Sequence, residues 1–424
     1  MFRRGRALRD PVTITLDGAA VPAERGEPLA VALIASGRVT LARSPKLHRP
    51  RAPTCLRGGC DGCLARVDGV PNVMTCLRPA AGGERIEVQN VVGSRQADLL
   101  QVTDWFFPQG IDHHHLMAGV PGLSAVMQSI ARKLAGLGRL PSAALAAEPA
   151  ARLDVDAAVI GAGPAGVAAA SALASRGLRV ALIDDGLAPA GSLAGAPRRA
   201  EELLARHPLD GVRVLSRHVA AGVYLGELLV AGDAGATVIR APAKVFATGA
   251  HDGVAAFPNN DLPGVFSARA FCRLLAHGVE PTGPVALAGE GFWADELAGA
   301  LGDRIAARIP LAALAAVNGI SQVKGVTVRE APFGPDSPTT DLKVVAVAVD
   351  APAAPSFEVA AQAGARVEAD PRAGYAVRVD ARGRAGDGVW ALGECTGAAL
   401  DLAAIERAAA TVADDVLAAR GAAA

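Results

Sequence analysis

The 424-residue sequence lacks an excess of charge of either sign and lacks long apolar runs. It has 42 Lys and Arg against 42 Asp and Glu, for a formal net charge of zero. This balance gives no indication of binding to nucleic acid or to an anionic membrane surface. No stretch reaches the roughly 18 uninterrupted apolar residues of a membrane-spanning helix. Arg3 and Arg4 are followed by no apolar segment of a signal peptide, so we expect a cytoplasmic protein.

Cysteine is also scarce, since the chain has only six. Six cysteines are too few for a disulfide-rich scaffold of this length. Four of them gather between residues 55 and 76, and such clustering favours metal binding over disulfides. The length itself allows two or three domains.

The rest of the sequence is organised around residues 155–166, VDAAVIGAGPAG. This stretch reads as an apolar strand, a glycine turn and the start of a helix. Gly161, Gly163 and Gly166 have the G-x-G-x-x-G spacing of dinucleotide-binding folds, in which the second glycine lets the backbone approach a pyrophosphate. The helix N-terminus then presents free N–H groups to that pyrophosphate.

The residues that follow this glycine turn support a dinucleotide site. A helix is predicted over residues 164–175, and a second strand over residues 179–183 ends on Asp184. An acid at this place binds the adenosine ribose in such folds. The alternative is a glycine-rich turn followed by a surface Asp, which the order of elements makes the weaker interpretation.

The clustered cysteines have the spacing C-x4-C-x2-C, with twelve residues before the fourth. The four are Cys55, Cys60, Cys63 and Cys76. This order is that of plant-type 2Fe–2S ligation. Gly58, Gly59 and Gly62 would let the loop wrap a cluster and present N–H groups to sulfur. The alternatives are a zinc site, which usually has two C-x2-C pairs, or thiols clustered by chance.

Short strands and turns surround the cysteines. Strands over residues 12–16 and 21–23 flank Asp17-Gly18, which is a hairpin signal, and a short helix is expected near residues 29–37. A second hairpin is expected around Asp68-Gly69, and it would bring Cys76 back to the other three cysteines. This stretch, roughly residues 12–92, resembles the small 2Fe–2S domains of molybdenum hydroxylases and of the sarcosine oxidase alpha family.

A connector is predicted next. Residues 104–110, DWFFPQG, include one Trp and two Phe in a chain with few aromatic residues. His113, His114 and His115 follow. Apolar residues at helical spacing then predict an amphipathic helix over residues 123–137. We interpret this helix as packing the first domain onto its neighbour. Three consecutive His cannot all face one metal from a regular helix or strand, so no metal site is assigned to them.

Two later stretches resemble further fingerprints of flavoproteins with two dinucleotide-binding domains. Residues 244–249, KVFATG, resemble the second fingerprint, and residues 388–394, GVWALGE, resemble the third. Together the three fingerprints imply that FAD, rather than NAD, occupies the first site. The residues implied to bind FAD are Gly161, Gly163, Pro164, Ala165, Gly166, Asp184, Asp185, Val219, Ala247, Thr248, Gly249, Gly393 and Glu394.

An insert over residues 284–365 occupies the place of an NAD(P) domain. Residues 285–291, VALAGEG, again read as a strand followed by G-x-G, with Ala294 at the place of the third glycine. The following strand, residues 304–309, has no acid at its end. An intact NAD(P) domain and a structural remnant therefore both stay open, and we expect NAD(P) to bind weakly or not at all.

Residues 257–271 and 359–365 complete a resemblance to the alpha-type subunits of heteromeric flavin amine dehydrogenases and oxidases. That family includes hydrogen cyanide synthase, opine oxidases, D-hydroxyproline and dye-linked proline dehydrogenases, and the N-terminal half of sarcosine oxidase alpha. The resemblance implies a separate FAD-containing beta subunit that oxidises an amino acid or secondary amine, while this chain transfers the electrons. It leaves open an FMN at a subunit interface, and no residue of this chain is assigned a catalytic role.

The expected fold is α/β, a Rossmann-like flavoprotein with two dinucleotide-binding domains and an N-terminal β-grasp-like 2Fe–2S domain. The expected segments are a 2Fe–2S domain at 1–100, a connector at 101–153, an FAD domain at 154–283 and 366–424, and the insert at 284–365. One alternative function is a self-contained NAD(P)H-dependent reductase that passes electrons to its fused cluster. Another is a thiol–disulfide flavoenzyme, which needs a C-x-x-C pair, whereas Cys272 and Cys395 are single.

Overall fold

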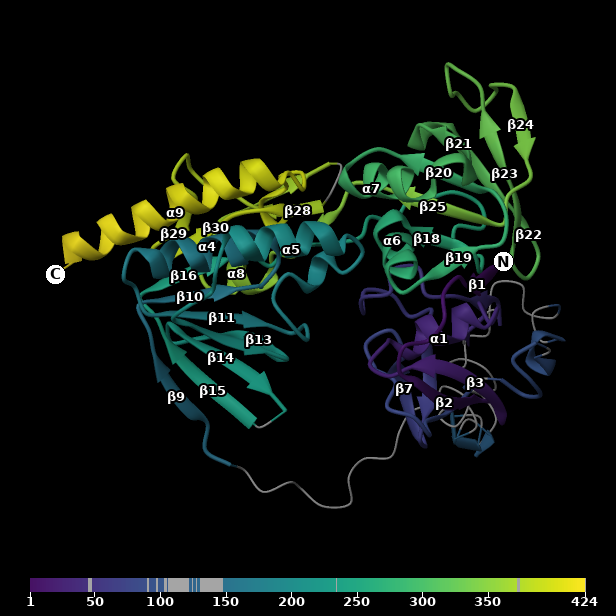
Figure 1. The fold of residues 1–424 in the computed structure, drawn as a ribbon, viewed down its shortest axis with the longest axis horizontal. Coiled ribbons are helices and arrows are strands. Elements are labelled where there is room, and N and C mark those ends of the chain that lie inside the picture. The colour runs from purple at the N-terminus through teal and green to yellow at the C-terminus, as the bar shows by residue number, and fades with distance from the viewer. Residues whose placement is uncertain are drawn as a thin grey trace. The chain divides into compact units, whose positions relative to one another are not determined.

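The protein, seen in a computed structural model, consists of two compact units (Figure 1). The first unit combines Met1–Ala144 with Ala255–Asp350, and the second combines Leu145–Val254 with Ala351–Ala424. The residues that the structure describes are 1–44, 48–89, 91–96, 98–102, 105, 122–123, 125–126, 128–129, 148–233, 235–371 and 374–423. Each unit is thus built from two separate parts of the chain.

Most of the predicted connector lies outside the described residues. This applies to His113, His114 and His115 and to most of the expected helix over residues 123–137, so their interpretation stays a prediction. Trp105 is described, and its side chain is 84% exposed.

The N-terminal domain of the first unit is a five-stranded sheet with one helix. The sheet has the order β3 (Ala19–Glu24), β2 (Pro11–Leu16), β8 (Arg85–Glu87), β6 (Leu64–Val67) and β7 (Val70–Met74), and the helix is α1 (Leu29–Ala35). The two hairpins turn at Asp17-Gly18 and Asp68-Gly69, as the sequence predicted. Helix α1 packs against β3 and buries six consecutive residues. Shorter elements are β4 (Ala42–Arg43), β5 (Pro50–Arg51) and η1 (Leu99–Val102).

Residues 255–350 form what we call the inserted layer. Its parallel sheet has the order β18 (Val265–Ser267), β25 (Ala346–Asp350), β20 (Val285–Gly289) and β21 (Ile305–Ile309). Its helices are α6 (Ala268–Ala276) and α7 (Phe292–Leu301), with η3 (Gly302–Arg304) and η4 (Leu311–Ala313). An antiparallel sheet follows, made of β22 (Leu314–Gly319), β23 (Val323–Arg329) and β24 (Thr339–Leu342).

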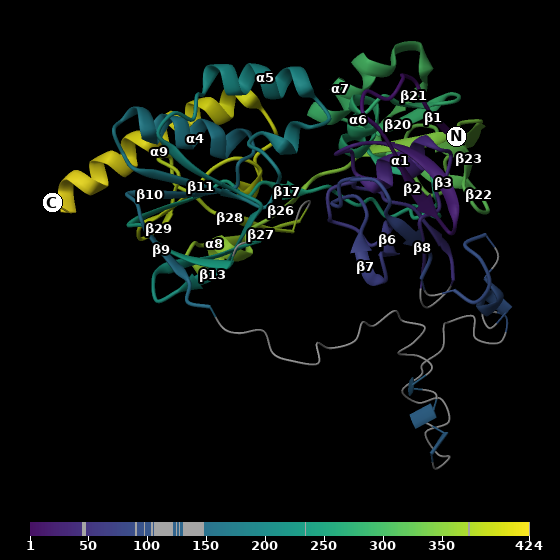
Figure 2. The ribbon, with the colours of Figure 1, turned by 60° about the horizontal axis from the view of Figure 1, so that its bottom comes forward.

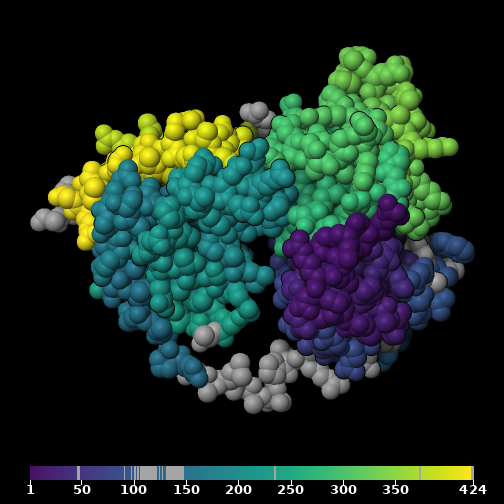
Figure 3. Space-filling view, in the orientation of Figure 1, coloured from purple at the N-terminus to yellow at the C-terminus, as the bar shows by residue number. Residues whose placement is uncertain are grey.

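The N-terminal domain and the inserted layer are joined within the first unit, and Figure 3 shows them in contact. Strand β1 (Phe2–Arg4) pairs with β19 (Val279–Pro281) in antiparallel register. The Phe2 ring packs 5.4 Å from the Phe266 ring and 5.5 Å from the Phe271 ring. A strand pairing and an aromatic cluster thus fix the cysteine-bearing domain to the inserted layer.

The second unit is built on a six-stranded sheet, which Figure 2 shows from another side. Its order is β12 (Val212–Ser216), β11 (Val180–Asp184), β10 (Ala157–Ile160), β16 (Ala243–Phe246), β30 (Val389–Ala391) and β29 (Arg384–Gly386). All neighbours are parallel except β29 and β30. A second sheet has the order β13 (His218–Tyr224), β14 (Glu227–Gly232), β15 (Gly235–Arg240) and β9 (Ala151–Asp154).

The helices of this unit are α4 (Pro164–Ser175), α5 (Pro197–Arg206), α8 (Glu358–Gln362) and α9 (Leu402–Ala423). Shorter elements are η2 (Gly191–Leu193), η5 (Glu394–Thr396), β17 (Ala250–His251), β26 (Ala354–Pro355), β27 (Val367–Asp370) and β28 (Gly374–Val377). Alternate residues of β10 enter different cores, as the two-residue period of a strand requires. Ala157 and Val159 pack with residues of α4 and α9, while Ala158 and Ile160 pack on the opposite side with residues of β14. A strand covered on both faces reads as continuously apolar.

A helix that crosses a bilayer must be both long enough and apolar enough, and this applies to the helices among the described residues. None of them meets both conditions.

Candidate functional site

The four predicted cluster cysteines lie together in the N-terminal domain as two pairs. The Cys55 Sγ atom lies 3.4 Å from the Cys60 Sγ atom. The Cys63 and Cys76 thiols contact each other, because the β6–β7 hairpin begins just after the first and ends just before the second. All four are free thiols.

This pairing fits the 2Fe–2S prediction. A 2Fe–2S cluster takes two ligands on each of its two irons. A structural zinc site instead gathers four ligands around one ion. Two sulfur pairs brought together by one loop and one hairpin therefore fit a two-iron cluster.

The two sulfurs of each pair shift each other's pKa in opposite directions. The Cys55 thiol donates to the Cys60 sulfur, which lowers the pKa of Cys60 to about 5 and raises the pKa of Cys55. The same contact in the other pair lowers the pKa of Cys63 and raises that of Cys76. The thiolate is the form that binds metal, so the lowered pKa of Cys60 and of Cys63 favours the ligating form of these two sulfurs.

The loop around Cys55 supplies backbone donors to sulfur. The N–H groups of Arg57 and Gly59 donate to the Cys55 Sγ atom at 3.4 and 3.2 Å. At Gly62 a Cβ atom would lie 1.9 Å from the Ala52 carbonyl oxygen, so a larger residue would push the loop open. Donors to sulfur and a tightly folded loop are what a cluster-binding segment requires.

The glycine turn of the second unit has the geometry of a dinucleotide site. It connects β10 to α4, and Gly163 lies at the start of the helix without a side-chain cap. At Gly161 a Cβ atom would lie 2.2 Å from the Ala247 carbonyl oxygen, and at Gly166 it would lie 1.7 Å from the Gly161 carbonyl oxygen. Close backbone contacts thus require glycine at these two positions. At Gly163, by contrast, a Cβ atom would meet only the Ser192 side chain.

The acid at the end of β11, Asp184, is held beside this turn by hydrogen bonds. Asp184 ends β11, and its carboxylate accepts hydrogen bonds from the N–H of Ala162 at 2.6 Å and of Gly186 at 2.7 Å. It therefore lies at the glycine turn, where the ribose contact was predicted. Asp185 is exposed, and Val219 lies in β13 with 54% of its surface exposed.

The residues of the other two fingerprints come to the same edge of the sheet. Ala247, Thr248 and Gly249 follow β16, and Gly393 and Glu394 follow β30, both of which run parallel to β10. Parallel strands present their carboxyl ends at one edge, where ligands bind in open α/β sheets. The two loops meet the start of α4, since a Cβ atom on Gly393 would lie 2.8 Å from the Ala165 Cβ atom.

Ser192 is a residue of this site that we did not predict from the sequence. Its Oγ atom is buried and has no hydrogen-bond partner in the described part of the chain. It would lie 3.0 Å from a Cβ atom placed on Gly163. An unpaired buried hydroxyl beside a helix N-terminus fits a site for a pyrophosphate. The only sequence signal was the small-residue run 190–192 after Asp184.

The glycine motif of the inserted layer differs from that of the second unit at the N-terminus of the helix that follows it. Gly289 and Gly291 form the turn between β20 and α7, as the sequence predicted. The Asp350 carboxylate, at the end of β25, accepts a hydrogen bond from the Ala294 N–H at 2.8 Å. A carboxylate therefore occupies the N-terminus of α7, where a dinucleotide would place its pyrophosphate. Two negative groups would compete for the same donors.

We expect NADH and NADPH to leave the flavin oxidised, or to reduce it only slowly. The reasons are the Asp350 carboxylate at the helix N-terminus and the lack of an acid after β21. Anaerobic mixing with each nucleotide, followed by flavin absorbance, measures this directly. Asp350→Asn should increase nucleotide binding by removing the charge, and Asp295→Asn, on the exposed side of α7, serves as the control. Fast bleaching of the unmodified protein would contradict the expectation.

The segments of the chain that carry these two sites both match known protein families. Residues 9–91 match the 2Fe-2S iron-sulfur cluster binding domain family, and residues 155–331 match the pyridine nucleotide-disulphide oxidoreductase family. The sarcosine oxidase subunit alpha of Rhizobium meliloti (strain 1021) is 31% identical over 317 residues, which cover 66% of this chain and 32% of that protein. The chain is homologous to the sarcosine oxidase alpha subunits. It combines a 2Fe–2S domain with an FAD-type oxidoreductase domain.

A second sarcosine oxidase alpha subunit, from Corynebacterium sp. (strain U-96), is 28% identical over 61% of this chain and 26% of its own length. The chain therefore spans about a third or less of the curated relatives it matches. L-proline dehydrogenase from P. horikoshii superimposes with a TM-score of 0.72 at 22% identity, over 99% of this chain and 76% of that one. This match confirms the expected α/β flavoprotein fold with its N-terminal 2Fe–2S domain.

Proposed function

We propose that this chain is the electron-transferring FAD and 2Fe–2S subunit of a heteromeric dehydrogenase or oxidase. A separate FAD-containing beta subunit oxidises an amino acid or a secondary amine, and this chain carries the electrons to an acceptor. The observation that carries the proposal is the presence in one chain of a flavin-type dinucleotide site and a cysteine loop arranged for a one-electron cluster. The relatives act in the same class, since their names are sarcosine oxidase and proline dehydrogenase.

When bound, FAD supplies two-electron chemistry that can be divided into single electrons for a cluster. The residues of this chain hold and orient the two cofactors. The N-terminus of α4 and the Ser192 hydroxyl support the pyrophosphate, and Asp184 supports the ribose. Cys55, Cys60, Cys63 and Cys76 support the cluster. These assignments and the remaining predicted FAD contacts are part of the proposal.

The remaining thiols do not favour disulfide chemistry. Burial raises the pKa of Cys272 to about 12 and that of Cys395 to about 11. The Cys395 thiol donates to the Leu392 carbonyl oxygen at 3.3 Å, within the loop of the third fingerprint. A thiol with a raised pKa is a poor nucleophile, and neither residue has a second cysteine at C-x-x-C spacing. Both act as small buried side chains.

Activity is expected to require a second subunit. The chain is purified alone and together with the product of the neighbouring gene, and both samples are assayed with amino acids and N-methylated amines and a dye acceptor. The complex should turn over, while the lone chain should show no more than background. Full turnover by the lone chain would contradict the proposal. Reduction of the lone chain by NADH or NADPH would favour the self-contained reductase instead.

A further inference from the structure

The inserted layer contacts the loop that carries the first predicted cluster ligand. The Ser267 N–H donates to the Thr54 carbonyl oxygen at 2.8 Å. The Arg273 guanidinium, from α6, donates to the Leu56 carbonyl oxygen at 2.6 Å. Thr54 and Leu56 are the two neighbours of Cys55 in the chain. The inserted layer thus donates hydrogen bonds to the backbone on both sides of Cys55.

Arg273 brings a positive charge to these thiols. Burial lowers the pKa of Arg273, the charges of Cys76 and Cys55 oppose that shift, and the nearby Arg57 cation adds to it. The guanidinium thus lies within electrostatic range of one cysteine from each pair. An arginine stays protonated in proteins under ordinary conditions. Its Nε atom is shielded from solvent and has no hydrogen-bond partner in the part of the chain that the structure describes. A shielded cation with an unused donor suits an anionic neighbour.

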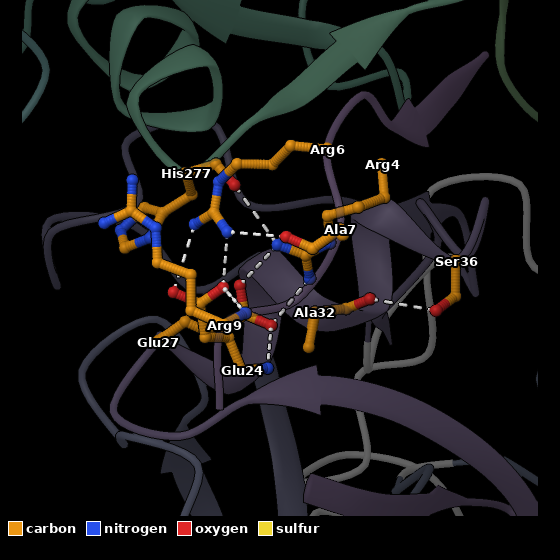
Figure 4. Close-up of polar contacts among 9 residues, drawn as sticks. All are labelled: Arg4, Arg6, Ala7, Arg9, Glu24, Glu27, Ala32, Ser36 and His277. Carbon is orange, nitrogen blue, oxygen red and sulfur yellow. Dashed lines mark hydrogen bonds and ion pairs between the residues drawn. The ribbon is translucent and has the colours of Figure 1, made fainter. Parts of the chain in front are cut away.

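Polar contacts of Arg4, in β1, join the N-terminal domain to the residue that follows α6, and Figure 4 shows the residues involved. Arg4 makes two hydrogen bonds to the Glu27 carboxylate, at 2.8 and 2.6 Å, and one to the carbonyl oxygen of His277 at 3.2 Å. Glu27 follows β3 in the N-terminal domain, and His277 directly follows α6. This ion pair is buried on the Glu27 side. These contacts fix the C-terminal end of α6, the helix that carries Arg273, to the N-terminal domain.

We propose that Arg273 is the residue through which the inserted layer raises the reduction potential of the cluster in the N-terminal domain. This rests on the proposed cluster ligands. Reduction of a 2Fe–2S cluster by one electron adds one negative charge to a centre already held by four thiolates. A fixed cation that is shielded from water stabilises the reduced state more than the oxidised state. The inserted layer would then serve the cluster rather than a nicotinamide.

Three variants separate the charge of Arg273 from its hydrogen bond. Arg273→Met removes both, Arg273→Gln keeps a donor for Leu56 without the charge, and Arg273→Lys keeps the charge. The midpoint potential is measured by EPR-monitored redox titration of the intact protein. The Met and Gln variants should lower the equilibrium constant for reduction about tenfold, which corresponds to about 59 mV for one electron. The Lys variant should remain near the unmodified protein.

Arg308→Met is the matched control, because Arg308 forms an exposed ion pair with Asp295 on the inserted layer. Its potential should not change. Cluster assembly in the Lys variant but not in the neutral variants would also support a need for the charge. A Gln variant with unchanged potential, or loss of the cluster from all three variants, would overturn the proposal. Absence of iron and sulfide from the unmodified protein would instead refute the cluster ligands themselves.

Discussion

Replacing Cys60 by Ser should remove the cluster and leave the flavin in place. A serine hydroxyl is a much weaker donor to iron than a thiolate, and Cys60 is the thiol whose pKa is lowered to about 5 by the Cys55 contact. The residues proposed to bind the flavin lie in the other compact unit, so we expect them to keep their contacts. Iron and acid-labile sulfide should fall below about a tenth of the unmodified content, while flavin content stays unchanged.

Cys272→Ser is the control for this variant, because Cys272 is a buried thiol outside the cluster loop. It should keep iron, sulfide and flavin. Both proteins are purified without oxygen, so that loss of the cluster by oxidation is excluded. Full cluster content in Cys60→Ser would contradict the ligand set, and zinc without sulfide in the unmodified protein would favour the zinc site.

Gly163→Val should strongly weaken FAD binding without unfolding the second unit. Gly163 has φ −72° and ψ −172°, an extended conformation that valine adopts readily. No backbone atom lies near its Cβ position, and the nearest atom is the Ser192 Oγ at 3.0 Å. The valine methyl groups would instead fill the space in front of the helix N-terminus that the pyrophosphate needs. FAD affinity should fall at least about tenfold, or about 1.4 kcal/mol.

Gly161 and Gly166 are unsuitable for this test, because a side chain at either position would collide with backbone. Gly421→Val serves as the control, since this glycine lies in α9 and no atom lies near its Cβ position. Flavin absorbance after gel filtration gives the FAD content, and circular dichroism shows whether each variant is folded. A folded Gly163→Val protein with full FAD content would place the flavin elsewhere.

Short sequence patterns correctly predicted the turns, the helix and the strands whose conformation depends mainly on neighbouring residues. The turns at Asp17-Gly18 and Asp68-Gly69 need residues that accept positive φ, and both hairpins form there. The helix predicted over 164–175 is α4 with the same limits, because a glycine turn precedes it and Gly177 follows it. The short strands before Asp184 and before Thr248 were also found, since each is an apolar run bounded by turn residues.

Contacts between distant residues could not be predicted in this way. Arg273 and Leu56 are 217 positions apart, and Asp350 and Ala294 are 56 positions apart. An arginine in an amphipathic helix and an aspartate after a strand are both ordinary surface residues in a sequence. Only the folded chain shows that one reaches the cysteine loop and that the other caps a helix.

The limits of the insert illustrate the same point. Its predicted limits, residues 284–365, come from the glycine motif and from its place between the second and third fingerprints, and they stay a prediction. In the structure, β18 and α6 precede residue 284 and share the layer of β20. Strand β18 has three residues, which is too short for any periodicity to reveal.

Reduction of the cluster by an amine tests the proposed function most directly. The complex is mixed anaerobically with an amine that it oxidises, frozen within a turnover, and examined by EPR for the reduced 2Fe–2S signal. We predict that the signal appears in the complex and is absent both from the lone chain and from a complex carrying Cys60→Ser. Oxidation of the amine at full rate while the cluster stays oxidised would contradict electron transfer through this chain.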